Sequence, residues 1–411
     1  MANFIDAIFF LYMFIGLYML FLLVLIYFPN RKNIFDFPQA KIEPISIIVP
    51  CYNAEKLIGR TLDSLMNLNY PKSMVEIIVV DDKSKDKSVG VVRSYVKKYS
   101  NIRLIISERN SGGAAEPTNI GIKNAKYDIV AVTDDDSTPD KNSLLKMVGF
   151  LQNDRKVAAV TCAVMAKNPA TFIQKLQAIE YTLISWSRKL LDLVDSVYVT
   201  PGPFALYRKK YLEEVGLFDT KNMTQDIEIV WRLLSHGYKA RMSLGARVYS
   251  ETPFKFKDWF RQRVRWNIGG TQTLMKYKKM IFRKGMLGNF IVPFFSASLF
   301  LGIFGLGIFV YLFGRRFMLS YLSTKHSLYG GTALLYLQDV TFSPSILNYF
   351  GVVLFIAGSL FTVTGLIVMK EIRSKYSKLF NILFYMLVYL TVYPIIMITA
   401  LYKILAGNYK W

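Results

Sequence analysis

Three short stretches decide the predicted fold: ISIIVPCYNAE (Ile45–Glu55), IIVVDDKS (Ile77–Ser84) and IVAVTDDDS (Ile129–Ser137). Each stretch begins with a run of β-branched and other apolar residues and ends in polar or acidic side chains. Short apolar runs bounded by turn residues are typical of strands that are buried on both faces of a sheet. Together with one similar run, they predict strands at Ile45–Val49, Ile77–Val80, Ile102–Ile106 and Ile129–Val132.

Segments with helical spacing separate these strands. They are Ala54–Asn67, Asp86–Tyr99 and Ser111–Ala125. Alternation of strands and helices at this rhythm predicts an α/β domain in which crossover helices connect the strands of a mostly parallel sheet. In open sheets of this kind the ligand binds beyond the carboxyl ends of the strands. The residues that directly follow each strand are therefore the candidates for a functional site.

Acidic residues gather at that edge of the predicted sheet. Asp81 and Asp82 follow the second strand, and Asp134, Asp135 and Asp136 follow the fourth. Like charges about 4 Å apart repel by roughly 4 kcal/mol at an effective dielectric of about 20, so we expect a shared cation. The chain has two Cys and two His, which excludes a site built mainly from thiolates or imidazoles. Oxygen ligands alone favour Mg²⁺ or Mn²⁺. The alternative for Asp136 is capping of a helix N-terminus.

The composition indicates a membrane protein. Among 411 residues, 51 Lys and Arg minus 29 Asp and Glu give a net charge of +22, and 53% of the residues are hydrophobic. This composition excludes a disordered chain and argues against an ordinary soluble enzyme. The first apolar stretch is longer than the core of a signal peptide and lacks a small-residue cleavage site, so we interpret it as a retained anchor. Stretches long enough to cross a hydrocarbon core of about 30 Å lie at Ala7–Phe28, Gly285–Gly314, Val340–Met369 and Leu379–Tyr402.

The distribution of basic residues predicts an orientation. The segment Lys255–Lys284 holds ten basic residues and one acidic residue, and further basic residues follow the first and third apolar stretches. By the positive-inside rule these segments lie in the cytoplasm. The predicted division is an N-terminal transmembrane helix (1–29), a cytoplasmic domain (30–252), an amphipathic interface helix (253–284) and a C-terminal transmembrane region of three helices (285–411). No nucleic-acid-binding motif accompanies the charge, so the expected partner is the lipid bilayer and not nucleic acid.

A set of ordered motifs makes the chain resemble the membrane-embedded family 2 glycosyltransferases, which include the hyaluronan, chitin, cellulose and poly-N-acetylglucosamine synthases. The resemblance implies a GT-A type nucleotide-sugar-binding domain with about four transmembrane helices and amphipathic interface helices. It also implies a metal-dependent, inverting transfer of sugar from a nucleotide-sugar donor, expected to be UDP-linked. The motifs are SIIVPCYN (Ser46–Asn53) with Glu55, VVDDKS (Val79–Ser84), DDD (Asp134–Asp136), PGPFALYR (Pro201–Arg208), TQDI (Thr224–Ile227) and QRVRW (Gln262–Trp266).

The resemblance implies roles for individual residues. Asp226 would be the catalytic base that removes the proton from the acceptor hydroxyl, and Asp134 and Asp136 would hold Mg²⁺ or Mn²⁺. The implied acceptor-binding residues are Gly202, Pro203, Phe204 and Trp266. The implied nucleotide-sugar-binding residues are Pro50, Tyr52, Glu55, Asp81, Asp82, Asp134, Gln262, Arg265 and Trp266.

Gln262, Arg265 and Trp266 have the spacing i, i+3 and i+4, which places them on one face of a helix. A planar guanidinium suits diphosphate oxygens, and an indole offers a flat apolar face to a sugar ring. The alternative is a basic amphipathic helix on the membrane surface, and we expect both interpretations to hold. Pro169–Val194 is also amphipathic, and its periodicity alone fits an interface helix or a core helix equally well.

Two alternatives remain for the function. Ser111–Asn119 lacks the Lys that polymerising relatives carry, and Gln225 stands where the family has Glu. The prediction is transfer of a sugar to a growing glycan, and the alternative is transfer of a single sugar to a lipid acceptor such as polyprenyl phosphate or a glycolipid. A non-catalytic transporter or nucleotide sensor is a further alternative, although it leaves Asp226 without a function. For Asp226 itself, the competing role is that of an N-cap residue of the helix predicted over Ile227–His236.

Overall fold

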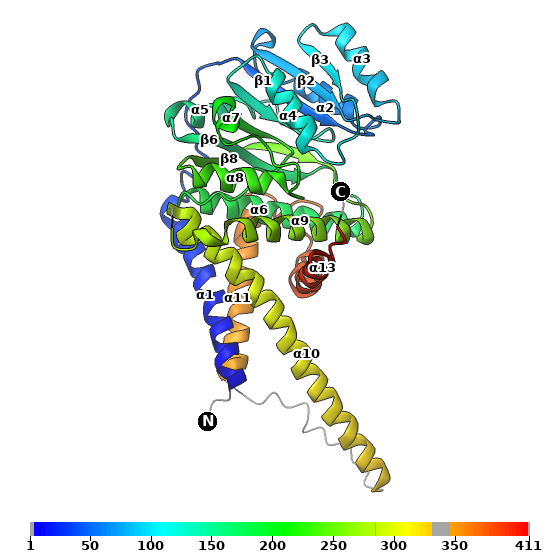
Figure 1. Cartoon of the computed structure of the whole chain (residues 1–411). Coiled ribbons are helices and arrows are strands. Elements are labelled where there is room, and N and C mark those ends of the chain that lie inside the picture. Colours follow the sequence, from blue (N-terminus) through cyan, green and yellow to red (C-terminus); the bar gives the residue numbers. More distant parts are fainter. Residues whose placement is uncertain (1–3, 284, 331–345, 410–411) are drawn as a thin grey trace.

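The computed structural model describes residues 4–283, 285–330 and 346–409. Its centre is an eight-stranded sheet with the order β3-β2-β1-β4-β7-β6-β8-β5 (Figure 1). The four predicted strands are confirmed as β1 to β4, and four further strands follow in the chain. The bounds are β1 Ile45–Cys51, β2 Val75–Asp81, β3 Ile102–Ile106, β4 Ile129–Val132, β5 Thr138–Pro139, β6 Val157–Ala166, β7 Ala205–Arg208 and β8 Lys239–Ser250.

One half of the sheet is parallel and the other half is mixed. β2 pairs in parallel with β1 and β3, and β1 pairs in parallel with β4. β7 runs antiparallel to β4 and β6, whereas β6 and β8 are parallel and the short β5 is antiparallel to β8. The predicted α/β domain is confirmed, and its parallel half carries the acidic residues at the carboxyl ends of β2 and β4.

Helices cover both faces of the sheet because successive strand residues point to opposite sides. Ile48 and Val132 belong to a buried cluster that includes residues of α4, α6, α8 and α9, whereas Ile47 and Ala131 pack with residues of α2, α3 and α5. The helices of this domain are α2 Ile58–Met66, the 3₁₀ turn Lys72–Met74, α3 Ser88–Lys98, α4 Ala115–Asn124, α5 Leu145–Asn153, α6 Phe172–Asp192, α7 Lys209–Glu214, α8 Gln225–Ser235 and α9 Phe256–Tyr277.

The three helices predicted between the strands are confirmed as α2, α3 and α4, but each begins later than predicted. The start of α4 shows why. Ser111 donates its backbone N–H and its hydroxyl to Oδ2 of Asp82, both at 2.9 Å, so this part of the chain is held at the sheet edge. The helix therefore begins only at Ala115.

Two long helices, α6 and α9, form a layer between the sheet and the apolar helices (Figure 1). α6 begins with a capping box, in which Thr171 accepts a hydrogen bond from the Gln174 N–H and the Gln174 side chain accepts one from the Thr171 N–H. Each helix buries a tryptophan, Trp186 on α6 and Trp259 on α9. This layer separates the polar half of the molecule from the apolar half.

The apolar helices lie on the other side of this layer. Within the described residues, three helices are long and apolar enough to cross a membrane: Phe10–Asn30, Leu287–Tyr329 and Leu379–Leu405. A shorter apolar helix covers Val352–Val368. The elements of this half are α1 Phe4–Asn30, the 3₁₀ turn Lys278–Met280, the π-helical turn η3 Leu287–Ile291, α10 Val292–Tyr329, α11 Ile346–Val368, α12 Leu379–Phe384, the π-helical turn η5 Tyr385–Tyr389, the 3₁₀ turn η6 Leu390–Val392 and α13 Tyr393–Leu405.

The predicted apolar stretches all fall on these helices, with two differences. The third stretch begins at Val340, and residues 340–345 lie outside the described part of the chain. The second was predicted to end at Gly314, but α10 continues to Tyr329. Figure 1 shows α1 and α11 along their length and α13 nearly end-on below α9. The helix α13 therefore does not run parallel to α1 and α11.

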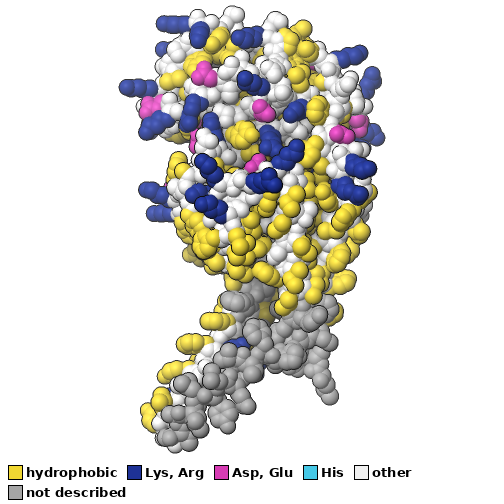
Figure 2. All heavy atoms as spheres, turned by 180° about the vertical axis from the view of Figure 1, so that it is seen from behind, with side chains coloured by type: hydrophobic (Ala, Val, Ile, Leu, Met, Phe, Trp, Pro, Cys, Tyr) yellow, Lys and Arg dark blue, Asp and Glu magenta, His cyan; other side chains and the backbone are white. Residues whose placement is uncertain are grey.

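The surface divides in the same way. Seen from behind, hydrophobic side chains cover the lower part of the described surface, and Lys and Arg side chains gather above it (Figure 2). Phe21, Leu25 and Phe300 are among the large apolar side chains that are more than half exposed. Apolar surface of this extent is typical of a contact with a membrane or a partner protein.

A substitution at Gly365 tests the packing of α11 against α6. A Cβ atom at Gly365 would lie 2.4 Å from Cε3 of the buried Trp186, so Gly365→Val forces these helices apart. Overpacking of this kind costs about 1–3 kcal/mol, and we expect the melting temperature of the purified protein to fall by several degrees. Gly358→Val is the matched control on the same helix, because a Cβ atom at Gly358 meets nothing within 4 Å. An equal loss for both variants would contradict the contact.

Candidate functional site

A cavity of about 770 Å³ opens at the carboxyl edge of the sheet. Its wall is built from the ends of β1, β2 and β4, the start of α4, one face of α6, the start of α8 and one face of α9. Segments that are distant in the sequence thus meet around one space. The predicted site residues in this wall are Pro50, Tyr52, Asp82, Asp134, Asp136, Gly202, Pro203, Asp226, Gln262, Arg265 and Trp266.

Three predicted site residues do not line the cavity. Phe204 is fully buried beneath the cavity, and its carbonyl oxygen accepts a hydrogen bond from the Cys162 thiol at 3.4 Å. Glu55 accepts a hydrogen bond from the Lys87 N–H at 3.0 Å. Asp81 is buried and accepts a hydrogen bond from the Ser84 N–H at 3.0 Å. The side chains of Glu55 and Asp81 therefore hold the turn after β2.

The acidic residues after β4 differ in their surroundings. Asp134 lies on the cavity wall, where burial and the charges of Asp136 and Asp135 raise its pKa well above the usual value. Asp135 accepts a hydrogen bond from the Tyr52 N–H at 3.1 Å, and burial raises its pKa to about 7. Burial also raises the pKa of Asp136, although its hydrogen bond with the Ser137 hydroxyl, at 3.1 Å, opposes this shift. Clustered carboxylates of this kind favour a bound cation.

The alternative of helix capping does not account for Asp136. No helix begins at this residue, because the short strand β5 follows at Thr138–Pro139. Asp136 Oδ1 lies within 3.4 Å of the hydroxyl of Ser250 at the end of β8, so its carboxylate is held between two serines. The side chain is thus free of a capping role and faces the cavity.

The turn after β2 keeps its shape without a glycine. Lys83 lies in this turn, and its φ of +64° is in the left-handed region that favours glycine. A side chain in this conformation costs on the order of 1 kcal/mol. The turn directs Asp82 into the cavity wall, where its Oδ1 atom is buried without a hydrogen-bond partner in the described residues. An acceptor atom of this kind suits an N–H donor of a ligand.

Asp226 lies in the first turn of α8 and on the cavity wall. Thr224 is the N-cap residue of α8, and its side chain makes no capping hydrogen bond. Oδ1 of Asp226 accepts a hydrogen bond from the backbone N–H of Ile227 at 3.1 Å. Burial raises the pKa of the Asp226 carboxyl, and the guanidinium groups of Arg265 and Arg188 partly offset this shift. A carboxylate with a raised pKa is a stronger base than an exposed carboxylate.

Arg188 is a cavity residue that the sequence reasoning missed. It lies on α6 with 4% of its surface exposed, and its Nε and Nη1 atoms have no hydrogen-bond partner in the described residues. Burial lowers the pKa of Arg188, while Tyr198 and Asp226 stabilise its charge. The signal was present in the sequence, because Arg188 is a charged residue within the amphipathic segment Pro169–Val194.

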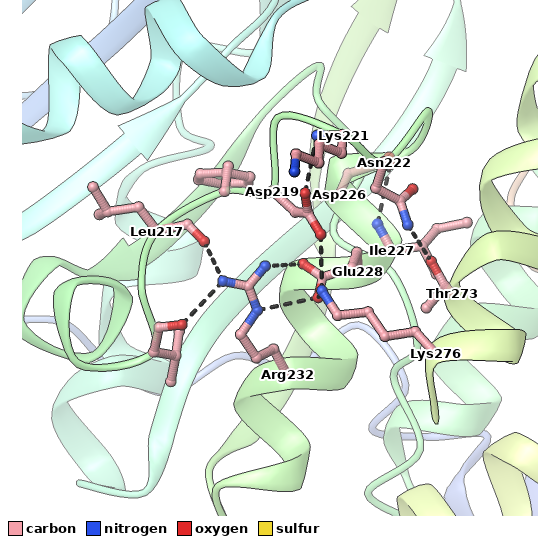
Figure 3. Close-up of polar contacts among 12 residues, drawn as sticks. Leu217, Asp219, Lys221, Asn222, Asp226, Ile227, Glu228, Arg232, Thr273 and Lys276 are labelled. Carbon is pink, nitrogen blue, oxygen red and sulfur yellow. Dashed lines mark hydrogen bonds and ion pairs between the residues drawn. The ribbon is translucent and has the colours of Figure 1, made fainter. Parts of the chain in front are cut away.

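A network of charges fixes α8 against its surroundings (Figure 3). Lys276 of α9 contacts Glu228 at 2.7 Å and Asp219 at 2.8 Å. Arg232 contacts the same glutamate and donates to the carbonyl of Leu217 at 2.7 Å. Glu228 is fully buried, whereas the Lys276 side chain is 45% exposed, so solvent screens this ion pair in part. The helix that carries Asp226 is therefore held rigidly against α9.

α9 supplies the last part of the wall. Gln262, Arg265 and Trp266 all line the cavity, as their shared helix face predicts. The ring of Trp266 stacks on that of Tyr181 of α6 with 6.4 Å between the ring centroids. The cavity therefore joins acids from the sheet edge to cations and aromatic rings from the interface layer.

This arrangement agrees with comparisons to known proteins. The model of the family described as "Glycosyltransferase like family 2" matches residues 43–269, which include every cavity residue described above. The chain therefore belongs to the family 2 glycosyltransferases.

Two relatives are informative. The chain is 30% identical over 281 residues to the probable glycosyltransferase YdaM of Bacillus subtilis, an alignment that covers 66% of this chain and 65% of the relative. It is 31% identical over 251 residues to the poly-beta-1,6-N-acetyl-D-glucosamine synthase of Staphylococcus aureus, which covers 61% of this chain and 60% of the relative. The alignments thus span less than two thirds of these relatives.

A solved structure shares the fold. The mannosyltransferase PcManGT of Pyrobaculum calidifontis, described in complex with GDP-mannose and Mn²⁺, superposes with a TM-score of 0.59 at 18% identity. The match covers 97% of this chain and 99% of the mannosyltransferase. The predicted GT-A type fold is thereby confirmed.

Neighbouring glycines on α9 test the placement of Asp226. A Cβ atom at Gly269 would lie 2.2 Å from Thr224 Oγ1 and 2.6 Å from the Thr224 nitrogen, at the start of α8. Gly269→Ala should displace the start of α8 and with it Asp226; if Asp226 is a reacting group, as the sequence predicts, kcat should fall by roughly 10- to 100-fold. Gly270→Ala is the matched control, since a Cβ atom there meets nothing within 4 Å. Sugar transfer is measured for both variants. Equal activity of the two variants would contradict the claim that the contact of Gly269 with Thr224 places Asp226.

Proposed function

We propose that the protein transfers a sugar from a nucleoside diphosphate sugar to a hydroxyl group of a growing glycan, with inversion at the transferred carbon. One observation carries the proposal: Asp136, Arg265 and Asp226 converge on a single cavity. An inverting displacement requires support for the departing diphosphate on one side and a base for the incoming hydroxyl on the other. The side chains around the cavity supply both.

The donor would occupy the side of the cavity formed by the sheet. Asp82 Oδ1 has no partner in the described residues and suits an N–H of a nucleotide base, such as uracil, while Tyr52 lies nearby to pack against the base. Arg265 would bind the diphosphate through its planar guanidinium. These side chains support a UDP-linked donor, whose diphosphate would lie beside Asp134 and Asp136.

The same acids fit a divalent cation. In the described residues no three His, Cys, Asp or Glu side chains are grouped closely enough to hold a metal alone. Mg²⁺ is commonly bound by one or two carboxylates together with substrate phosphates and water, and Asp134 and Asp136 meet that requirement. Mg²⁺ or Mn²⁺ bound there would neutralise the departing diphosphate. The Mn²⁺ in the archaeal mannosyltransferase supports this assignment.

The acceptor would enter beside α6 and α8. Asp226 would take the proton from its hydroxyl; burial raises the pKa of this carboxyl, and the charges of Arg265 and Arg188 act against that shift. Gly202 and Pro203 would contact the acceptor, and Trp266 would offer a face to its sugar ring. In this arrangement the base would come from α8, and the acids beside the diphosphate would come from the end of β4.

The membrane arrangement belongs to the same proposal. The apolar helices would anchor the chain in the cell membrane in several passes, and the basic segment Lys255–Lys284 would place the catalytic domain in the cytoplasm. Nucleotide sugars made in the cytoplasm would reach the cavity directly. The bilayer is the expected partner of the apolar surface in Figure 2.

The acceptor has two candidates. The synthase from Staphylococcus aureus favours a growing glycan as acceptor. The absence of Lys from Ser111–Asn119 favours transfer of one sugar to a lipid acceptor. Product sizing separates them, because a ladder of chain lengths indicates polymerisation and a single glycolipid indicates one transfer.

The assignment of the base leads to a first test. Purified protein is offered a panel of UDP- and GDP-sugars with Mg²⁺ or Mn²⁺, and release of the nucleoside diphosphate is measured. Asp226→Asn should lower turnover by roughly 10²- to 10⁴-fold because the base is lost, while nucleotide affinity stays within about twofold. Unchanged turnover would remove Asp226 from the mechanism. Release without metal, or after chelation, would contradict the role of Asp134 and Asp136.

The pH dependence leads to a second test. Asp226 accepts a proton only when ionised, so kcat should rise with pH through its raised pKa. Arg188→Gln removes a positive charge that lowers this pKa, and the acid limb of the profile should therefore move to higher pH. Arg188→Lys keeps the charge and should shift the limb less. A limb that stays in place, or moves to lower pH, in the glutamine variant would refute this role.

A further inference from the structure

The last apolar segment reaches the layer that forms the cavity wall. Tyr389 of η5 donates its hydroxyl to Oε2 of Glu180 at 2.6 Å, and Tyr393 of α13 donates to Oε1 of the same residue. Glu180 lies on α6 with 2% of its surface exposed. The Glu180 carboxylate, on one of the two helices of the layer, thus accepts hydrogen bonds from two tyrosine hydroxyls. Both tyrosines belong to Leu379–Leu405, which is long and apolar enough to cross a membrane.

The same carboxylate holds a guanidinium of α9. Arg263 donates from Nε to Oε1 of Glu180 at 3.1 Å and from Nη2 to Oε2, and its own exposed fraction is 0%. Each carboxylate oxygen is therefore shared by one guanidinium N–H and one tyrosine hydroxyl. A buried ion pair is stable only when further hydrogen bonds satisfy it, and the two tyrosines supply these.

Arg263 in turn contacts two residues of the cavity wall. Its Nη1 donates to Oε1 of Gln262, and its guanidinium carbon lies 4.0 Å from the ring centroid of Trp266. A desolvated cation at this distance from an indole restrains the orientation of the ring. A continuous series of contacts therefore runs from Tyr389 and Tyr393 to the side chains that face the substrate.

The backbone of the segment fits this function. Its helix is interrupted by a π-helical turn at Tyr385–Tyr389, which ends at Tyr389, and a 3₁₀ turn at Leu390–Val392, after which α13 begins at Tyr393. π-helical turns are frequent at functional sites. Figure 1 shows α13 nearly end-on beneath α9. The ring centroids of Tyr389 and Trp259 are 4.7 Å apart, so this part of the segment packs directly on α9.

We propose that Leu379–Leu405 is a positioning element for sugar transfer and not only an apolar anchor. Tyr389 and Tyr393 set the Glu180–Arg263 pair, and this pair sets Trp266 against the acceptor sugar. Both tyrosines are positioning residues, because neither lines the cavity. The link to sugar transfer rests on the proposed function, whereas the contacts among these side chains do not depend on it.

The test removes two hydroxyls from the full-length protein. The Tyr389→Phe/Tyr393→Phe double variant should raise the acceptor KM about tenfold while the donor KM stays within about twofold. Tyr385→Phe is the matched control, since Tyr385 is buried in the same turn and its hydroxyl does not bond to Glu180. An unchanged acceptor KM, an equal rise in the donor KM, or the same loss in the control would overturn the proposal.

Hydrogen exchange separates the positioning role from the reaction. Backbone exchange over Gln262–Gly269 should be faster in the double variant than in the wild type and in Tyr385→Phe. Unchanged exchange would overturn the positioning role even if sugar transfer fell. If the wild-type protein released no nucleoside diphosphate from any donor, the proposed function would fail, and exchange would still decide whether the tyrosines fix α9.

Discussion

The carboxylates of Asp134, Asp136 and Asp226 face one cavity, where burial raises the pKa of each. Such a group of acids destabilises the fold unless positive charge comes close to it. Two arginines on different helices meet part of this need, Arg188 on α6 and Arg265 on α9. These helices thus bring positive charge to the acidic sheet edge, and the remaining need for positive charge is what a divalent cation would meet.

Much of the fold could be predicted because the strands β1 to β4 are continuous apolar runs with acids at their ends. The strand β6 could not be recognised in the same way. Its sequence, VAAVTCAVMA (Val157–Ala166), is rich in alanine and almost wholly buried, and periodicity cannot separate such a run from a buried helix. The antiparallel pairing of β7 likewise depends on tertiary contacts and leaves no local pattern.

Motifs located most of the cavity wall because each places a side chain directly after a strand or on one helix face. They did not identify Arg188 or Glu180, because the significance of a charge on a buried helix face depends on partners elsewhere in the chain. The partner of Glu180 at Tyr389 is 209 residues away. Phe204 illustrates the opposite error, since a residue inside a motif can lie beneath the surface that its neighbours form.

The layer formed by α6 and α9 contacts the cavity on one side and the apolar helices on the other. One face of α9 carries Arg265 and Trp266 to the cavity, and the other face rests on α13. In the proposed membrane placement, lateral pressure, curvature and acyl-chain length would act on α13, which connects to Trp266 through the contacts of Glu180 and Arg263. If the segment lies in a bilayer as proposed, the affinity for the acceptor would therefore depend on the lipid composition, and the dependence would be strongest when the acceptor is not saturating.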